Sequence, residues 1–377
     1  MKICIVNCFD TYEHRVDLLV NYFSNKGDDV SVITSNYRHI EKVYRTESKD
    51  KYTFVDTISY QKNMSYARLH SHWKLAKNIF NNLPKDVDLL WVLVPPNSFT
   101  KRAAEYKNQN STTVLVFDII DMWPETLPVG KMKNIFPLRL WRDLRDLHLN
   151  AADYIVTECD LYRTRLKNIP NSKISTLYLS YGDRTLTRKI VNQNQDSNSI
   201  SICYLGSINN IIDIQVITNI LNSLSKKYSV NFHLIGAGEN KDSLLSSVKQ
   251  LNVNVIDHGK IYDDDKKAEI LNCCHFGLNI MKKDVFVGLT MKSLDYFKNG
   301  IPIINNLKGD TWEFVENNDI GINTTTGYID TDILSDYTER YGFVEDFYDK
   351  NFSEQKFYSD LEEILQKIMG LNHEQKI

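Results

Sequence analysis

The segment 287–306, VGLTMKSLDYFKNGIPIINN, combines a lysine, an acid and a turn in an order that suits a charged ligand. Lys292 and Asp295 fall in one predicted helix, which starts near Thr290, a residue that can cap it. The free amides at a helix start favour anionic oxygen. An acid one turn further along can accept hydrogen bonds from both ribose hydroxyls. The segment therefore predicts a nucleoside diphosphate site, the plainer alternative being that Lys292 and Asp295 are only a surface ion pair.

Two other segments, CYLGSINN (203–210) and HLIGAG (233–238), place glycine directly after an apolar run. Glycine there lets the backbone approach a phosphate or a base, although each glycine could equally serve an ordinary turn. Lys260, in HGKIY (258–262), is expected to add positive charge. The predicted nucleotide-binding residues are Gly206, Ser207, Gly236, Lys260, Ile261, Gly288, Leu289, Thr290, Lys292 and Asp295.

Carboxylates also gather at the end of an apolar run in the first half, in FDIIDMWPE (117–125). Three acids within eight residues are poorly explained by packing alone. Asp118 or Asp121 is expected to accept a hydroxyl proton or to hold a sugar hydroxyl, as a general base would. The alternative is a capped turn with a buried Trp123. Glu125 completes the group.

The loop after the first apolar run, NCFDTYEHR (7–15), carries Asp10, Glu13 and His14 and is a candidate for binding a second substrate. The start of a surface helix explains these residues equally well. His70 and His72 are expected to be solvated or structural.

These motifs follow apolar runs that alternate with amphipathic stretches, a pattern typical of a parallel sheet covered by helices on both faces. The predicted strands are 2–7, 30–35, 88–95, 112–119, 153–158, 200–206, 230–238, 253–257, 276–280 and 301–305. A polar stretch at 191–199 reads as a linker. The sequence therefore predicts an α/β protein with two doubly wound, Rossmann-like domains, residues 1–190 and 200–350. Residues 351–377 are expected to form a terminal helix that packs back on the first domain.

The segment 287–306 resembles the donor-binding signature of family 4 glycosyltransferases, in which Lys-x-x-Glu-Tyr precedes a Gly-x-Pro strand. Lys292, Asp295 and Gly300 match, with Asp295 in place of the usual Glu, and Val287 stands where many members carry a second acid. The usual basic residue after the first glycine turn is absent from 207–217. The run 117–125 is similar to an Asp-x-x-Asp-x-Trp-Pro segment of polysaccharide glycosyltransferases.

The resemblance implies the GT-B fold, in which the two domains face a cleft, and retaining, metal-independent transfer from a nucleotide sugar, with a UDP-sugar expected. Asp118, Asp121 and Lys292 would be catalytic. Asp10, Glu13, His14, Trp123 and Glu125 would bind the acceptor, a glycan or a lipid-linked or protein-linked sugar. No metal, cofactor or nucleic acid is expected. Two alternatives stay open: a non-catalytic GT-B subunit that stabilises a partner transferase, and a sugar-nucleotide 2-epimerase.

The composition of the 377-residue chain fits two globular domains, with 42% hydrophobic and 25% charged residues. No apolar run reaches eighteen residues, and no signal peptide is recognisable, so a cytoplasmic location is expected. The six cysteines are scattered and are expected to be reduced. Residues 1–190 carry a net charge of +7 and the remainder −10. The stretch 131–145 mixes five basic residues with large apolar ones, which predicts a peripheral membrane contact; packing of its apolar residues against the sheet is the alternative.

Overall fold

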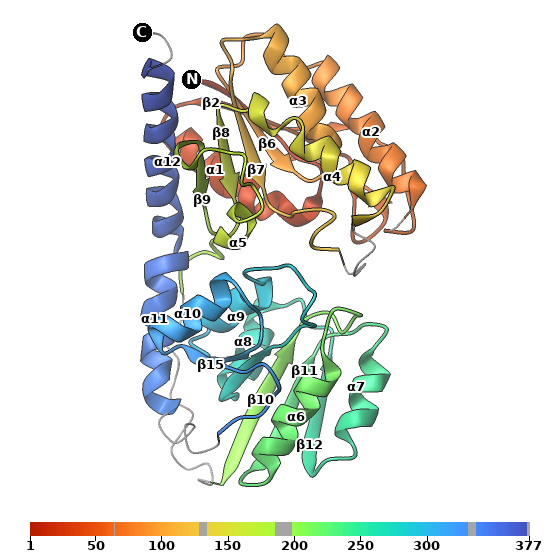
Figure 1. Ribbon diagram of the computed structural model, residues 1–377, viewed down its shortest axis with the longest axis vertical. Helices are drawn as coiled ribbons and strands as arrows, with labels where there is room; N and C mark the ends of the chain where they lie inside the picture. Colours follow the sequence, from red (N-terminus) through yellow and green to blue (C-terminus); the bar gives the residue numbers. More distant parts are fainter. Residues whose placement is uncertain (64, 128–133, 185–197, 331–336, 375–377) are drawn as a thin grey trace. The chain divides into compact units, whose positions relative to one another are not determined.

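A computed structural model describes residues 1–63, 65–127, 134–184, 198–330 and 337–374 of the chain (Figure 1). The chain divides into two compact units, one formed by Met1–Leu179 with Tyr358–Ile377, the other by Ser180–Phe357. The division after residue 179 comes earlier than the predicted boundary at 190. Of the predicted linker, residues 191–197 lie outside the described residues, and Ser199 already belongs to a strand.

The first unit contains a seven-stranded sheet, in which all neighbouring strands are parallel, with the order β5-β2-β1-β6-β7-β8-β9. Its strands are β1 (Lys2–Val6), β2 (Asp29–Ser35), β5 (Tyr52–Val55), β6 (Leu89–Val94), β7 (Val114–Ile119), β8 (Tyr154–Thr157) and β9 (Ile174–Thr176). Every residue of β6 is buried, as expected for a central strand covered on both faces. The chain reverses its direction across the sheet between β1 and β6, so loops that follow these strands are candidates for ligand binding.

Helices cover both faces of this sheet (Figure 1). On one side lie α2 (Tyr66–Asn81), α3 (Ser98–Gln109) and α4 (Leu138–Asp146), and on the other lie α1 (Glu13–Asn25) and the later part of α12 (Glu354–Glu374). Tyr22 of α1 and Lys26, which caps the end of α1, both bond to Glu362 of α12, the lysine at 2.7 Å. The short elements are β3 (Tyr37–Arg38), β4 (Val43–Tyr44) and α5 (Asp160–Arg163).

The second unit contains a six-stranded parallel sheet with the order β12-β11-β10-β13-β14-β15. Its strands are β10 (Ser199–Leu205), β11 (Ser229–Ile235), β12 (Val253–Gly259), β13 (Phe276–Asn279), β14 (Ile303–Asn305) and β15 (Gly321–Asn323). Its helices are α6 (Ile214–Ser225), α7 (Lys241–Val248), α8 (Asp264–Asn272), α9 (Met291–Lys298), α10 (Asp310–Asn318) and α11 (Tyr337–Phe352). Helices α6 and α7 lie on one face, and α8 to α11 on the other (Figure 1).

Two parallel α/β domains are thus confirmed. The sequence pattern does not predict β5, β9 and β15, because each is short and, unlike β8, β13 and β14, is not marked by a clear apolar run. Among the described residues, none of the helices combines the length and the apolar character needed to cross a bilayer.

Candidate functional site

A row of asparagines at the carboxyl ends of three strands of the second unit positions the start of α9. Asn279, Asn305 and Asn323, here called the asparagine ladder, end β13, β14 and β15 and are joined by side-chain hydrogen bonds of 2.8 Å. The Thr290 hydroxyl donates to Asn279 at 3.0 Å and accepts the Ser293 amide at 3.2 Å. Thr290 therefore caps α9, as the sequence predicts, and the ladder holds the cap in place.

The backbone before α9 offers amides to a ligand. The Gly288 carbonyl accepts the amide of Thr311 at 2.9 Å and its hydroxyl at 2.7 Å, which fixes the loop from behind. The N–H groups of Gly288, Leu289 and Thr290 make no hydrogen bond to any other described residue. Unpaired amides at a helix start form a binding site for anionic oxygen.

Lys292 supplies a cation at the same place. Its ammonium lies 4.7 Å from the ring centroid of Tyr204 and has no carboxylate partner among the described residues. Burial lowers the pKa of Lys292 to about 7. A partly desolvated amino group without an acidic partner binds an anion favourably, because the anion stabilises its charged form.

Asp295 does not pair with Lys292. Its carboxylate lies 2.8 Å from Nζ of Lys267 on α8, and that lysine also bonds to Asp264 at 2.8 Å. Burial raises the pKa of Asp295, and the charge of Lys267 opposes this shift. The alternative of a Lys292–Asp295 surface pair is therefore wrong.

Asp295 and Lys267 line a polar cavity of about 180 Å³ between α8 and α9. The other lining residues are Tyr181, Asp264, Asp265, Ala268, Lys298 and Asn299. A second cavity of the unit, about 430 Å³, follows the ends of β13 and β14 and is lined in part by Lys282, Lys283 and Lys308. Both cavities have polar or basic walls.

The glycines after β10 and β11 let two loops pack on one another. A Cβ on Gly236 would lie 2.0 Å from the carbonyl oxygen of Gly206, and both glycines have positive φ. The Gly206 amide donates to Ile235 and the Gly236 amide to Gly259. The close approach requires glycine at position 236, and the positive φ favours glycine at position 206, so each glycine has a structural reason within the fold. Next to them, Ser207 and Lys260 are exposed, and Ile261 is half-buried.

In the first unit, Asp118 has a structural role. It is fully buried in β7, and its carboxylate accepts bonds from Arg15 Nε and Nη2, both at 2.8 Å, and from Trp91 Nε1 at 2.9 Å. With both oxygens bonded inside the sheet, the carboxylate does not face a substrate. The expected catalytic role of Asp118 therefore does not fit its position.

Asp121 follows β7 and differs from Asp118 in forming no ion pair with any described basic residue. Its carboxylate accepts Trp123 Nε1 at 2.6 Å and the Thr126 hydroxyl. Burial raises the pKa of Asp121, and these hydrogen bonds oppose the shift. A carboxylate with a raised pKa and no ion pair suits proton transfer.

Of the other predicted acceptor residues, two acids form ion pairs within the fold, whereas Asp10 and His14 do not. Glu125 is buried and bonds to Arg145 at 3.1 and 3.2 Å, and Glu13 pairs with Arg45, so both carboxylates stabilise the fold. Asp10 accepts the His39 amide at 2.8 Å, and His14 is exposed.

Sequence reasoning did not single out Arg68 or Lys267, and it assigned His72 no binding role. Arg68 and His72 take the buried face of α2 together with Leu75 and Ile79. The sequence does contain a signal for Arg68 and His72. Both stand at positions that continue the apolar stripe of the helix, where a charged or polar residue is unusual.

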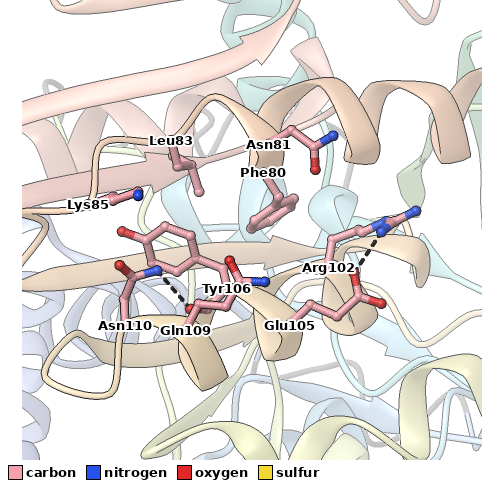
Figure 2. A pocket seen from close by; sticks show the side chains of 9 residues that line it. All are labelled: Phe80, Asn81, Leu83, Lys85, Arg102, Glu105, Tyr106, Gln109 and Asn110. Carbon is pink, nitrogen blue, oxygen red and sulfur yellow. Dashed lines mark hydrogen bonds and ion pairs between the residues drawn. The ribbon is translucent and has the colours of Figure 1, made fainter.

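A groove of about 370 Å³ between α2 and α3 lies elsewhere in the first unit (Figure 2). Its residues come from the ends of the two helices, where the chain enters the amino ends of β6 and β7, opposite the edge that carries Asp121. Arg102 and Glu105 form an ion pair of 2.7 Å there, and Asn110 bonds to the Tyr106 carbonyl. The groove shows no arrangement for catalysis. The described residues also include no group of three or more His, Cys, Asp or Glu side chains placed to hold a metal ion.

Solved structures with the same fold cover nearly the whole chain. The lipopolysaccharide outer core galactosyltransferase WaaB matches with a TM-score of 0.65 and 12% identity, over 97% of this chain and 99% of WaaB. HepE of Anabaena in complex with UDP-glucose matches with 0.65 and 14%, over 97% and 99%. Sucrose-phosphate synthase of Thermosynechococcus elongatus matches with 0.71 and 9%, over 98% and 99%. The chain therefore has the fold of the GT-B glycosyltransferases. No protein-family profile and no curated protein sequence matches it.

Proposed function

We propose that the protein is a glycosyltransferase that uses a nucleoside diphosphate sugar, with a UDP-sugar as the expected donor. The GT-B fold supports the proposal, as do the HepE structures with UDP and with UDP-glucose. The observation that carries it lies in the second unit, where the unpaired ammonium of Lys292 accompanies the free amides before α9. Together they form a site for a diphosphate.

In the proposed reaction the diphosphate departs with growing negative charge, which Lys292 and the amides of Gly288, Leu289 and Thr290 stabilise. Since these groups supply the positive charge, we propose that transfer requires no metal. Asp295, held by Lys267, would accept ribose hydroxyls in the polar cavity between α8 and α9.

The first unit would take the acceptor, which we propose to be a glycan or a lipid-linked or protein-linked sugar. Asp121 would accept the proton of the attacking hydroxyl, with Trp123 and Asp10 beside the acceptor; Asp118, Glu13 and Glu125 are assigned to the fold instead. Retention of the anomeric configuration is part of the proposal through the resemblance to family 4.

The test is a panel of nucleotide sugars, with and without a mixture of glycan acceptors, in which nucleotide release and the donor's configuration at C2 are followed. Release that depends on acceptor, and that Lys292→Met abolishes, supports transfer. Tight nucleotide binding without release in every combination would indicate the non-catalytic subunit instead. Conversion at C2 of the sugar would indicate the epimerase. Lys266→Met, on exposed surface of α8, is the matched control.

We further propose a peripheral membrane contact through residues 134–145. Residues 131–133 of the predicted stretch lie outside the described residues. Phe136 is 75% exposed and Leu140 55%, and Arg139 beside them is also exposed. Arg145, in contrast, is buried against Glu125 and does not contribute. Exposed apolar side chains next to a cation suit a lipid surface with anionic headgroups.

A further inference from the structure

Two cations of the first unit lack the acidic partners that such groups usually have. Arg68, in the first turn of α2, is only 5% exposed. Its Nη1 donates to the Asn63 carbonyl at 3.0 Å, and its buried Nε has no partner. Lys42 donates to the Asn63 side chain at 2.5 Å. Neither forms an ion pair with any carboxylate among the described residues.

Aromatic rings enclose both cations. The Arg68 guanidinium carbon lies 4.3 Å from the Trp123 ring centroid and 5.4 Å from that of Phe9. Lys42 Nζ lies 4.6 Å from the centroid of Tyr60. Cation–π contacts offset part of the cost of burying charge, but they do not satisfy the in-plane N–H groups of the guanidinium, of which Nε–H lacks an acceptor among the described residues.

His72, one helical turn beyond Arg68, adds a second unsatisfied group. It is 3% exposed, its ring stacks on Trp123 at 6.2 Å, and neither ring nitrogen has a hydrogen-bond partner in the part of the chain that the structure describes. Burial, assisted by the charge of Arg68, lowers the pKa of His72, so its ring is neutral and keeps one N–H to donate. Unpaired buried polar groups are rare in folded proteins and call for an explanation.

The nearest acids are engaged with other donors. Asp121 is bonded by Trp123 and Thr126, and Asp10 accepts the His39 amide. The charges of Asp10 and Asp121 therefore act on Lys42 and Arg68 without ion-pair contact. Donor groups of Arg68 and His72 stay unsatisfied beside the loops after β1 and β7, which carry Phe9, Asp10, Asp121 and Trp123. These loops leave the carboxyl edge of the sheet, where parallel α/β domains bind ligands.

We propose that Lys42, Arg68 and His72 form a subsite for an oxyanion carried by the acceptor, so that the acceptor is an anionic saccharide with a phosphate or carboxylate group. A guanidinium presents parallel N–H donors that match either group, and the imidazole supplies a further donor. The assignment to the acceptor rests on the proposed transferase function; the oxyanion site itself does not.

The experiment titrates the full-length protein, labelled at histidine, with inorganic phosphate, acetate, glucose 6-phosphate, glucuronate and glucose at constant ionic strength. The ring signals of His72 are followed by NMR, assigned with His72→Gln. A saturable shift with phosphate or glucose 6-phosphate supports the phosphate form of the proposal, and one with acetate or glucuronate supports the carboxylate form. An equal response to neutral glucose, or no saturable shift with any anion, overturns it.

Variants test whether the response to anions depends on the two cations. Arg68→Gln and, separately, Lys42→Gln are expected to weaken anion binding about tenfold or more, because each removes a charge-assisted donor. Lys74→Gln, on the exposed side of the same helix, is expected to bind as the parent does. Lys42 is partly exposed, so its variant remains informative where Arg68→Gln fails to fold. Unchanged binding in both variants overturns the assignment.

UDP binding, measured on the same samples by calorimetry, separates the two hypotheses. UDP binding without any anion response leaves the proposed donor site standing and rejects the subsite. An anion response without UDP binding rejects the transferase, and with it the assignment of the oxyanion to an acceptor.

Discussion

The ammonium of Lys292 lies 4.7 Å from the ring centroid of Tyr204, with no acid in ion-pair contact among the described residues. The face of the ring attracts the ammonium weakly through a cation–π contact but carries no negative charge to neutralise it. The amino group therefore sits where its charge is costly until an anion binds, and its pKa of about 7 reflects that cost.

Binding of UDP above pH 7 is expected to take up a proton. At pH 8 Lys292 is mostly neutral, and the diphosphate raises its pKa, so uptake approaches about one proton per site. Calorimetry in buffers of different ionisation enthalpy measures the uptake. Lys292→Met is expected to abolish it and to weaken binding. Equal proton uptake in parent and variant would contradict the assignment.

The same lysine makes the stability of the free protein depend on pH. Its pKa in the folded protein, about 7, lies below the ordinary value of 10.5, so between these values the unfolded chain binds more protons. The contribution of Lys292 to the free energy of unfolding is expected to rise from pH 7 towards pH 10.5. Urea unfolding of the parent and of Lys292→Met across this range shows whether the difference between them changes with this sign.

Asp295→Ala is expected to weaken UDP binding by about 1–3 kcal/mol, since ribose hydroxyls lose a charged acceptor. Lys267→Met should weaken it less, because the carboxylate remains but loses the cation 2.8 Å away that holds it. Isothermal titration with UDP measures the loss of affinity in both variants, and uracil, which has no ribose, is the control ligand. Parent-like affinity in Asp295→Ala would assign the acid to the fold alone.

Asp118→Asn is expected to lower the stability of the fold, and Asp121→Asn is expected to slow transfer. The first removes the charged partner that lies 2.8 Å from the buried guanidinium of Arg15, which costs about 3–5 kcal/mol of stability. The second should unfold near the parent's urea midpoint and slow transfer, with UDP affinity unchanged. Glu105→Gln, which breaks an ion pair with a 41% exposed acid, is the control and should cost about 0–1 kcal/mol. A stable but slow Asp118→Asn would return that acid to the site.

Phe136→Ser combined with Arg139→Glu is expected to reduce sedimentation with vesicles that contain anionic lipid, and high salt should reduce the binding of the parent. Tyr262→Ser, which replaces an 85% exposed aromatic residue of the second unit, serves as the control. Negligible binding by all three proteins at low salt would exclude the contact.

The sequence predicts those features that depend on residues close together in the chain. Apolar runs alternating with helices indicate parallel sheets, and Thr290 before an amphipathic stretch indicates a cap; the structure contains both. Pairings between distant residues were not accessible. Arg15 meets Asp118 across 103 positions, so only the fold reveals that this acid is neutralised. The spacing of Lys292 and Asp295 suggested a pair, whereas the partner of Asp295 comes from α8.

The hydrogen bonds of the asparagine ladder all donate in one direction, away from the start of α9. Read from the helix outward, the Ser293 amide donates to Thr290, Thr290 to Asn279, Asn279 to Asn305, Asn305 to Asn323, and Asn323 to the Trp312 carbonyl at 2.9 Å. Every rung accepts on one side and donates on the other, so successive bonds polarise one another in the same sense. An aspartate at any rung would accept but could not donate when ionised, and the sequence of donors would stop there. The geometry of the proposed phosphate site at the start of α9 is thus coupled to the chemical identity of Asn323 on the edge strand β15.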